Sequence, residues 1–289
     1  MADNIEEYRQ VIDQIDKDLH DLINKRAKIV EEIGAIKQKD GSPICHPQRE
    51  AQLIRKVLSR GENILPEATL IQIWRELIGA FTLLQDPSLK VSVPHLPDHP
   101  REILKEHARD YFGVHFPALN ASGARAALSM VREEHASFWV VPCPVAEEAA
   151  LWWTTRQPPE RRTANVLAKL PFTPVLDEEK IENRALVLGR FGYEPSGEDN
   201  SFLFVEADAQ ISRTRLITLL EKNNLKLISF YSHKSFLDDE TTKHFIEVEG
   251  YLGGDGKSIK ALKKELGKKL NLIFVAGGYA VPPKGRKMQ

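Results

Sequence analysis

Arg26 and Lys37 are two cationic residues whose spacing suits the binding of a small anion. Residues 11 positions apart in an α-helix are separated by about three turns and point within roughly 20° of each other. The residues between them on the same face are apolar: Ile29, Val30 and Ile33. Two cations bracketing an apolar strip could hold the two ends of a dianion. Arg26 could equally extend to the surface or pair with a carboxylate, so both interpretations stay open at this point.

Other polar residues of the first 86 positions could complete such a site. Arg9 lies on the same predicted helix as Arg26 but about 100° away around its axis. It cannot reach the same pocket in its own chain, although it could reach the pocket of a second chain. Arg49 and Glu50 fall in the first turn of the next predicted helix, and Gln85 ends the third. Taken singly, these three are also compatible with solvated helix ends.

The helix that carries these cations has an apolar seam. Ten positions spaced alternately by three and four residues carry nine apolar side chains, with Arg26 as the exception. They are Ile5, Tyr8, Ile12, Ile15, Leu19, Leu22, Arg26, Ile29, Ile33 and Ile36. A helix over 5–39 would be on the order of 50 Å long, and the two predicted helices that follow, over 47–60 and 66–85, are too short to cover it. We therefore expect an intertwined homodimer.

The remaining chain divides into two regions that differ in their expected secondary structure. At about 150 residues per domain, 289 residues predict two domains or three small ones. We expect a helical domain over 1–88, a small α/β region over 89–183, and a ferredoxin-like βαββαβ domain over 184–289. In the last region the expected strands are 201–207, 225–232, 243–250 and 270–275, and the expected helices are 212–223 and 257–268. The proline-rich stretch 91–100 is predicted to be a linker or an irregular entry into a new domain.

Composition excludes several classes of protein. Lys plus Arg number 40 and Asp plus Glu number 41, so the net charge of -1 argues against a nucleic-acid-binding or membrane-surface protein. Two cysteines cannot form a disulfide framework, and the polar, acidic N-terminus is not a signal peptide. His95 and His99, with Asp98, have the spacing of metal ligands but lie in the expected linker, so no metal site is predicted. A cytoplasmic protein is expected.

Three motifs of the N-terminal region resemble the all-helical class of chorismate mutases. They are Tyr8-Arg9 at the start of the long helix, the segment Pro43-Ile44-Cys45-His46-Pro47-Gln48-Arg49-Glu50-Ala51-Gln52, and the segment Trp74-Arg75-Glu76-Leu77-Ile78-Gly79-Ala80 leading to Gln85. The resemblance covers residues 5–86. It implies a three-helix chain that dimerises through its first helix, with each active site drawing residues from both subunits. The reaction would be the pericyclic rearrangement of chorismate to prephenate, which needs no cofactor and depends on positioning and electrostatics.

The resemblance also implies a role for each polar residue. Arg26 and Arg49 would bind substrate carboxylates, and Arg9 would bind a carboxylate from the neighbouring subunit. Lys37 and Gln85 would face the ether oxygen, where negative charge develops as the C–O bond breaks.

Glu50 would hold the substrate hydroxyl group. Two positions depart from the family pattern: His46, where many members have Asp or another polar residue, and Phe81, where a small Ser is common. We expect His46 at the rim of the pocket, and we expect Phe81 to narrow or dry it.

The rest of the chain resembles, more weakly, a mutase–prephenate dehydratase with a shortened dehydratase region. The stretch Asn183-Arg184-Ala185 stands where that family has Thr-Arg-Phe, so the catalytic threonine is absent and no dehydratase activity is expected. The C-terminal region resembles an ACT domain, which implies an aromatic amino acid, phenylalanine or tyrosine, as a possible effector. The alternative to an active mutase is a catalytically inactive dimeric regulatory or ligand-sensing protein with a mutase-like fold. The bifunctional enzyme is the least favoured hypothesis.

Overall fold

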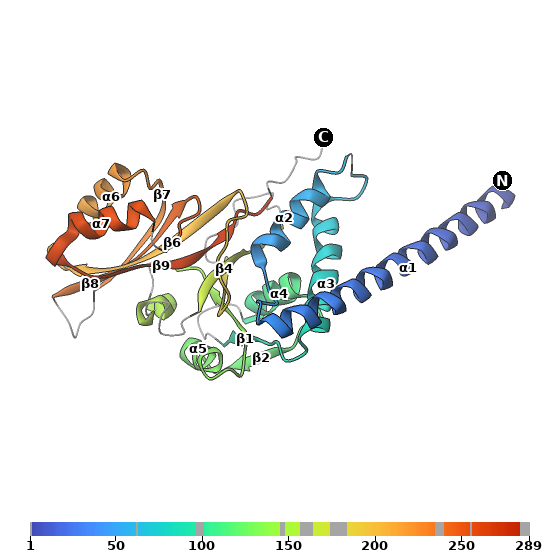
Figure 1. Cartoon of the computed structure of the whole chain (residues 1–289), viewed down its shortest axis with the longest axis horizontal. Coiled ribbons are helices and arrows are strands. Elements are labelled where there is room, and N and C mark those ends of the chain that lie inside the picture. Colours follow the sequence, from blue (N-terminus) through green and yellow to red (C-terminus); the bar gives the residue numbers. More distant parts are fainter. Residues whose placement is uncertain are drawn as a thin grey trace.

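A long helix extends from a body in which two further helices pack against a mixed α/β region, as Figure 1 shows for this computed structural model. The structure describes residues 2–61, 63–95, 101–144, 148–156, 164–173, 184–234, 240–254 and 256–283. Within these residues three helices come first and mixed helices and strands follow, which confirms the predicted order.

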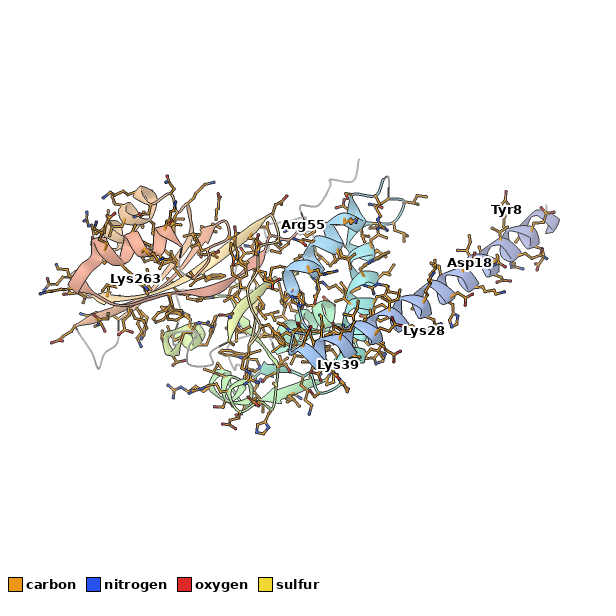
Figure 2. All side chains as sticks on the ribbon, viewed as in Figure 1. Tyr8, Asp18, Lys28, Lys39, Arg55 and Lys263 are labelled. Atoms are coloured by element: carbon orange, nitrogen blue, oxygen red, sulfur yellow. The ribbon has the colours of Figure 1, made fainter. Side chains whose placement is uncertain are left out.

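The three N-terminal helices lie close to where the apolar periodicity predicts them. They are α1 (Ala2–Asp40), α2 (Pro47–Leu58) and α3 (Glu67–Gln85). Pro47 begins α2, because a proline at the first position costs no helical hydrogen bond. Figure 2 shows Tyr8 and Asp18 on the part of α1 that extends from the body. The seam residues of that part, from Ile5 to Leu22, are 51% to 63% exposed, so nothing among the described residues covers the predicted apolar face.

The α/β region contains a continuous sheet in the order β2-β1-β3-β5-β4-β9-β6-β8-β7. Its first strands are β1 (Val91–Pro94), β2 (Ala118–Ala121), β3 (Phe138–Pro142), β4 (Asn165–Leu170) and β5 (Ala185–Gly189). The helical segments of this part are α4 (Arg101–Phe112), α5 (Ala124–Arg132) and the 3₁₀ segment η1 (Glu148–Thr155). A single parallel pair, Val166 with Gly277, joins this part of the sheet to the rest.

The C-terminal elements follow in the order that the sequence predicts: strand, helix, strand, strand, helix, strand. They are β6 (Asp199–Asp208), α6 (Arg213–Lys222), β7 (Leu227–Lys234), β8 (Thr241–Glu249), α7 (Lys257–Leu266), the short η4 (Gly267–Lys269) and β9 (Leu270–Ala280). The first strand, β6, lies between β8 and β9, and all three neighbouring pairs are antiparallel. Leucine and isoleucine side chains of α6 and α7 are buried with β6 and β8 in one apolar cluster.

Two expectations for the middle of the chain were wrong or incomplete. The start of the expected linker, Val91–Pro94, is strand β1, fully buried and paired in parallel with both β2 and β3. Pro94 is the last residue of the strand, beyond Val91 and Ser92, which are the residues that pair with β3. The remainder of that stretch, 96–100, which includes Asp98 and His99, lies outside the described residues. Strand β5, which the predicted boundary at 183/184 assigns to the third region, pairs with β3 and β4.

The helices and the sheet share a core. One cluster of buried residues contains Ile54 of α2 and Ile78 of α3 together with Phe112 of α4, Leu167 of β4 and Ala280 of β9. Burial of a large aliphatic or aromatic side chain is worth about 1.5–3 kcal/mol. The side of α2 and α3 that faces the sheet is therefore fixed by residues up to 229 positions away in the sequence, counting from Ala51 to Ala280.

No helix among the described residues combines the length and apolar character needed to cross a membrane.

Candidate functional site

A cavity of 510 Å³ lies where α1, α2 and α3 meet. Its lining contains seven of the eight residues that the sequence singled out for the site. The lining residues are Arg26, Val30, Ile33, Lys37, Ile44, His46, Arg49, Glu50, Leu53, Ile78, Phe81, Thr82, Gln85 and Glu194. Three basic side chains, Arg26, Lys37 and Arg49, share this lining with two acidic ones, Glu50 and Glu194, so the cavity contains more basic than acidic groups.

Arg26 and Phe81 form one wall of the cavity. The guanidinium carbon of Arg26 lies 4.4 Å from the centroid of the Phe81 ring, a cation–π contact. Burial lowers the pKa of Arg26 from its usual value, because removing water disfavours the charged form. Its Nη1 atom is buried and has no hydrogen-bond partner among the described residues. Phe81 thus lines the cavity and contacts Arg26, whose buried Nη1 is without a partner among the described residues.

Lys37 lies at the opposite end of the apolar strip that begins at Arg26. Its Nζ donates a hydrogen bond to the carbonyl oxygen of Ile44, 3.0 Å away. Burial lowers the pKa of the Lys37 ammonium, and the neighbouring Arg49 cation lowers it further, while the nearby acidic groups act in the opposite direction. One hydrogen bond leaves two of the three N–H donors of the ammonium group for other acceptors.

Gln85 reaches the cavity because α1 and α3 cross closely at Gly34. A Cβ added to Gly34 would lie 2.9 Å from Cγ of Gln85 and 3.3 Å from its Cα, so only glycine fits without displacement. The Nε2 of Gln85 donates to the carbonyl of Phe81 at 3.2 Å, and its buried Oε1 has no partner among the described residues. One N–H of the Gln85 amide is therefore used on Phe81, and its second N–H remains for a ligand.

The first turn of α2 supplies the other polar groups. Arg49 is exposed, whereas Glu50 is half-buried and accepts a hydrogen bond from Arg75 at 3.0 Å. His46 precedes the helix at the cavity rim, where its Nδ1 lies 3.5 Å from Oε2 of Glu194. His46 thus lines the cavity with a partly exposed side chain.

Arg9 is the one candidate that the structure does not bring to the cavity. It lies on the exposed part of α1, paired with Glu6 at 3.2 Å, and its side chain is 69% exposed. The 17 residues between Arg9 and Arg26 correspond to about 25 Å along the helix. The prediction that Arg9 cannot serve the pocket of its own chain agrees with this placement.

Sequence reasoning missed two residues connected with the cavity. Glu194 follows β5 and enters the lining from more than 100 residues away, and no local pattern indicates this. Arg75, the partner of Glu50, does carry a local signal. It occupies an apolar position of α3, between Ile71 and Ile78, as Arg26 does on α1.

A second and larger hollow of 1080 Å³ adjoins the first and shares Ile44 with it. Lys90 and Arg190 both line it, and Arg190 is paired with Glu134 at 2.7 Å. The described residues contain no group of three or more possible metal ligands. Asn183, which bears on the expected loss of the dehydratase threonine, lies outside the described residues.

Comparison with known families agrees with the resemblance of the N-terminal region. Residues 8–86 match the family described as "Chorismate mutase type II". A bifunctional chorismate mutase/prephenate dehydratase of Aquifex aeolicus (strain VF5) is 30% identical over 156 residues, which cover 53% of this chain and 42% of that protein. The T-protein of Enterobacter agglomerans is 26% identical over 187 residues, covering 62% of this chain and 47% of that protein. The chain thus spans less than half the length of these relatives.

Solved structures give a weaker likeness. The prephenate dehydratase of Arthrobacter aurescens in complex with L-Phe covers 69% of this chain and 92% of its own, at 10% identity and a TM-score of 0.49. A protein described as a novel type of quorum quenching acylase, GqqA, covers 66% of this chain and 94% of its own, at 14% identity and a TM-score of 0.48. Likeness at this level does not establish a shared function.

Proposed function

We propose that this chain, whose residues 8–86 match the chorismate mutase type II family, rearranges chorismate to prephenate in the cavity between α1, α2 and α3. The observation that carries the proposal is the meeting of Arg26, Lys37 and Arg49 in one cavity of suitable size for a small dianion. Leucine at position 26 would stabilise a purely structural bundle better than a cation does, because a desolvated charge is costly.

The reaction breaks a C–O bond and forms a C–C bond in one pericyclic step, so it requires no nucleophile and no proton transfer. The protein contributes by holding chorismate in its reactive conformation and by stabilising the charge that develops on the ether oxygen. In this proposal Arg26, through its free Nη1, and Arg49 bind the carboxylates. The ammonium group of Lys37 and the amide of Gln85 donate to the ether oxygen. Lys37 and Gln85 both line the cavity, which would favour electrostatic stabilisation without large reorganisation.

Glu50 accepts a hydrogen bond from the substrate hydroxyl group in the same proposal. Its carboxylate lines the cavity beside Arg49 and is already oriented by Arg75. His46 and Glu194 close the rim and exclude part of the solvent.

The complete site, as proposed, belongs to a homodimer. The exposed seam of α1 is long enough to cover the same seam of a second copy, and this arrangement would carry Arg9 to the partner's cavity. A site shared between two chains would explain why Arg9 lies far from the cavity of its own chain. The alternative, an inactive dimeric scaffold, would use the same seam without a need for the cations.

The C-terminal part is proposed to be an ACT-type domain over about 184–289, following a mutase domain over 1–88 and a shortened dehydratase-like region over 89–183. Its strand order, with β6 between β8 and β9, supports this assignment. An aromatic amino acid, phenylalanine or tyrosine, is the proposed effector.

The first experiment is an assay of chorismate consumption by the purified protein, with and without phenylalanine and tyrosine, with identification of the product. Chorismate loss with prephenate as the product is the expected result, and an effect of either amino acid would identify the effector. Phenylpyruvate as the product would favour the bifunctional enzyme. A folded dimer without turnover would overturn the proposal in favour of the inactive scaffold.

A second experiment tests whether the site is shared between chains. Arg9→Ala and Lys37→Ala subunits are inactive separately in this proposal, because each homodimer lacks one group in both sites. Mixing them and allowing exchange should restore activity, because each heterodimer has one site with both groups intact. Absence of recovery after demonstrated exchange would argue against sharing.

A further inference from the structure

Arg75 is a buried cation behind the proposed active site. It lies on α3, its side chain is 1% exposed, and its Nη1 donates to Oε2 of Glu50 at 3.0 Å. A buried guanidinium without a partner is strongly destabilising, so its one carboxylate partner among the described residues constrains where both groups lie. Glu50 is the residue in the pair that also faces the cavity, since its side chain is 20% exposed.

Two aromatic rings from the α/β region hold the guanidinium of Arg75. Its central carbon lies 4.1 Å from the ring centroid of Tyr111, on α4, and 4.5 Å from that of Phe172, just after β4. Guanidinium groups stack well on aromatic faces, and such contacts gain strength where water is excluded. Arg75 is thus held by two residues that do not belong to the segment matching the mutase family.

Glu50 stands at the boundary between the cavity and this buried contact. It lines the 510 Å³ cavity, and it also lines a second space of only 20 Å³ that includes Tyr111 and Phe112. Arg75 holds its Oε2, which leaves Oε1 for a ligand in the larger cavity. A shift of the Arg75 guanidinium would move the Glu50 carboxylate, because the two groups are in direct contact.

We propose that Arg75 is a positioning residue for the mutase reaction, acting through Glu50, and that Tyr111 and Phe172 make the α/β region part of the support of the mutase site. This inference rests on the proposed function and extends it. The α/β region then contributes to turnover itself, in addition to any role in sensing a ligand. Tyr111 and Phe172 lie outside residues 8–86, the segment that matches the chorismate mutase family.

The test is a double-mutant cycle between Arg75 and Glu50. Arg75→Met removes the charge while keeping an unbranched apolar chain, and we expect kcat to fall roughly tenfold to a hundredfold, as for a misplaced catalytic group. Arg75→Lys should restore part of the loss. In a Glu50→Gln background, Arg75→Met should have little further effect on kcat, because the group it positions is already changed. Equal losses in both backgrounds would overturn the proposal.

The aromatic support has a matched control just after the same helix. Tyr111→Leu should lower kcat severalfold and should lose this effect when Glu50 is already Gln. Phe116→Leu removes a buried ring that packs on Phe112 and Phe138 and makes no ring contact with Tyr111 or Arg75 among the described residues. It should lower stability by a similar amount and leave kcat unchanged. Equal effects of the two variants on kcat would show that Tyr111 acts only through stability.

A spectroscopic readout separates this inference from the proposed function. The carboxyl ¹³C resonance of Glu50, assigned by its disappearance in Glu50→Gln, should move in Arg75→Met and return toward its original position in Arg75→Lys. If wild-type protein does not turn over chorismate, the proposed function fails, whereas this resonance still decides whether Arg75 sets the carboxylate. An unmoved resonance in a folded Arg75→Met protein would overturn the inference.

Discussion

One side of the helical region is covered by the chain itself, and the other side is left exposed. The inward faces of α2 and α3 share a core with α4, β4 and β9, so that residues such as Ile54 and Ile71 are 1% exposed. The first half of α1 presents equally apolar residues, yet Ile12 and Leu19 are more than half exposed. The same kind of residue at the same helical spacing is therefore buried on one side and uncovered on the other.

This difference indicates two kinds of support for the proposed site. The wall made by α2 and α3 is held by distant parts of the same chain, through apolar packing and through Arg55 and Arg75. The wall made by α1 is proposed to depend on a second copy. Substitutions in either support should then lower activity even where the substituted residue does not contact substrate.

The largest effect is expected at Lys37, where the two sides meet. Lys37→Ala should lower kcat at least about a hundredfold, since a donor to developing charge is typically worth about 3–4 kcal/mol. Chorismate turnover measures this change, and circular dichroism should show an unchanged fold. Lys39→Ala, an exposed lysine on the same helix, is the matched control and should retain full activity. Near-wild-type turnover by Lys37→Ala would remove Lys37 from the site.

The exposed side should respond to charge on its seam. Leu19→Glu places a carboxylate in the proposed dimer interface, where an uncompensated charge costs about 3 kcal/mol or more. The dissociation constant of the dimer should rise about a hundredfold, measured by sedimentation, and turnover should fall with dissociation. Lys17→Gln makes the same change in net charge on the opposite face of α1 and should leave the dimer intact. A dimer that tolerates Leu19→Glu would contradict the proposed interface.

The covered side should respond to loss of Arg55, a residue of α2 that is labelled in Figure 2. Its guanidinium donates to the carbonyl oxygens of Glu198 and Val281, each at 2.8 Å, and to Ser196 Oγ at 3.0 Å. Arg55→Met should lower the free energy of unfolding by about 1.5–3 kcal/mol, the usual worth of hydrogen bonds from a charged group.

Chemical denaturation checks the Arg55 prediction, with Lys56→Met as the control on the neighbouring, exposed position. If both variants are equally stable, the contact between α2 and the C-terminal segment contributes little to folding.

The smallest effect is expected at Gly79, and its sign is informative. Alanine normally stabilises a helix interior by about 1 kcal/mol relative to glycine. A Cβ on Gly79, however, would lie 1.8 Å from the carbonyl oxygen of Phe112, so α4 would have to move. Gly79→Ala should therefore destabilise the protein by about 1–2 kcal/mol, as overpacking does.

The control for Gly79 is Gly254→Ala, whose added Cβ would meet nothing within 4 Å. Its unfolding free energy should stay within about 0.5 kcal/mol of wild type. A gain in stability on Gly79→Ala would mean that α3 and α4 do not pack as closely as the structure has them.

The parts predicted correctly from the sequence are those governed by local patterns. The helical period of the apolar seam was sufficient for α1, and the C-terminal strands and helices occur in the predicted order. Arg26 and Lys37 were placed on one face of α1 by that period, because spacing fixes which positions of a helix face the same way. Arg49, Glu50 and Gln85 were assigned to the site through the family resemblance.

The parts that escaped prediction depend on partners remote in sequence. Val91–Pro94 begins a stretch, 91–100, that contains Pro94, Pro97 and Pro100. It nevertheless forms a strand, because β2 and β3 flank it. Glu194 reaches the cavity only once β5 is paired within the sheet. Arg75 stood in a motif that the resemblance had already selected, but its role depends on Tyr111 and Phe172, which no helical pattern connects to it.

The core that includes both Cys45 and Ala280 cannot be completed until late in the synthesis of the chain. Once α3 has left the ribosome, roughly 200 residues must still be synthesised before β9 is available, which takes on the order of 10–40 s at about 5–20 residues per second. During that interval the inward faces of α2 and α3 lack their final cover. Nascent helices of this protein thus expose two apolar surfaces, and only one of them is covered when synthesis of β9 is complete.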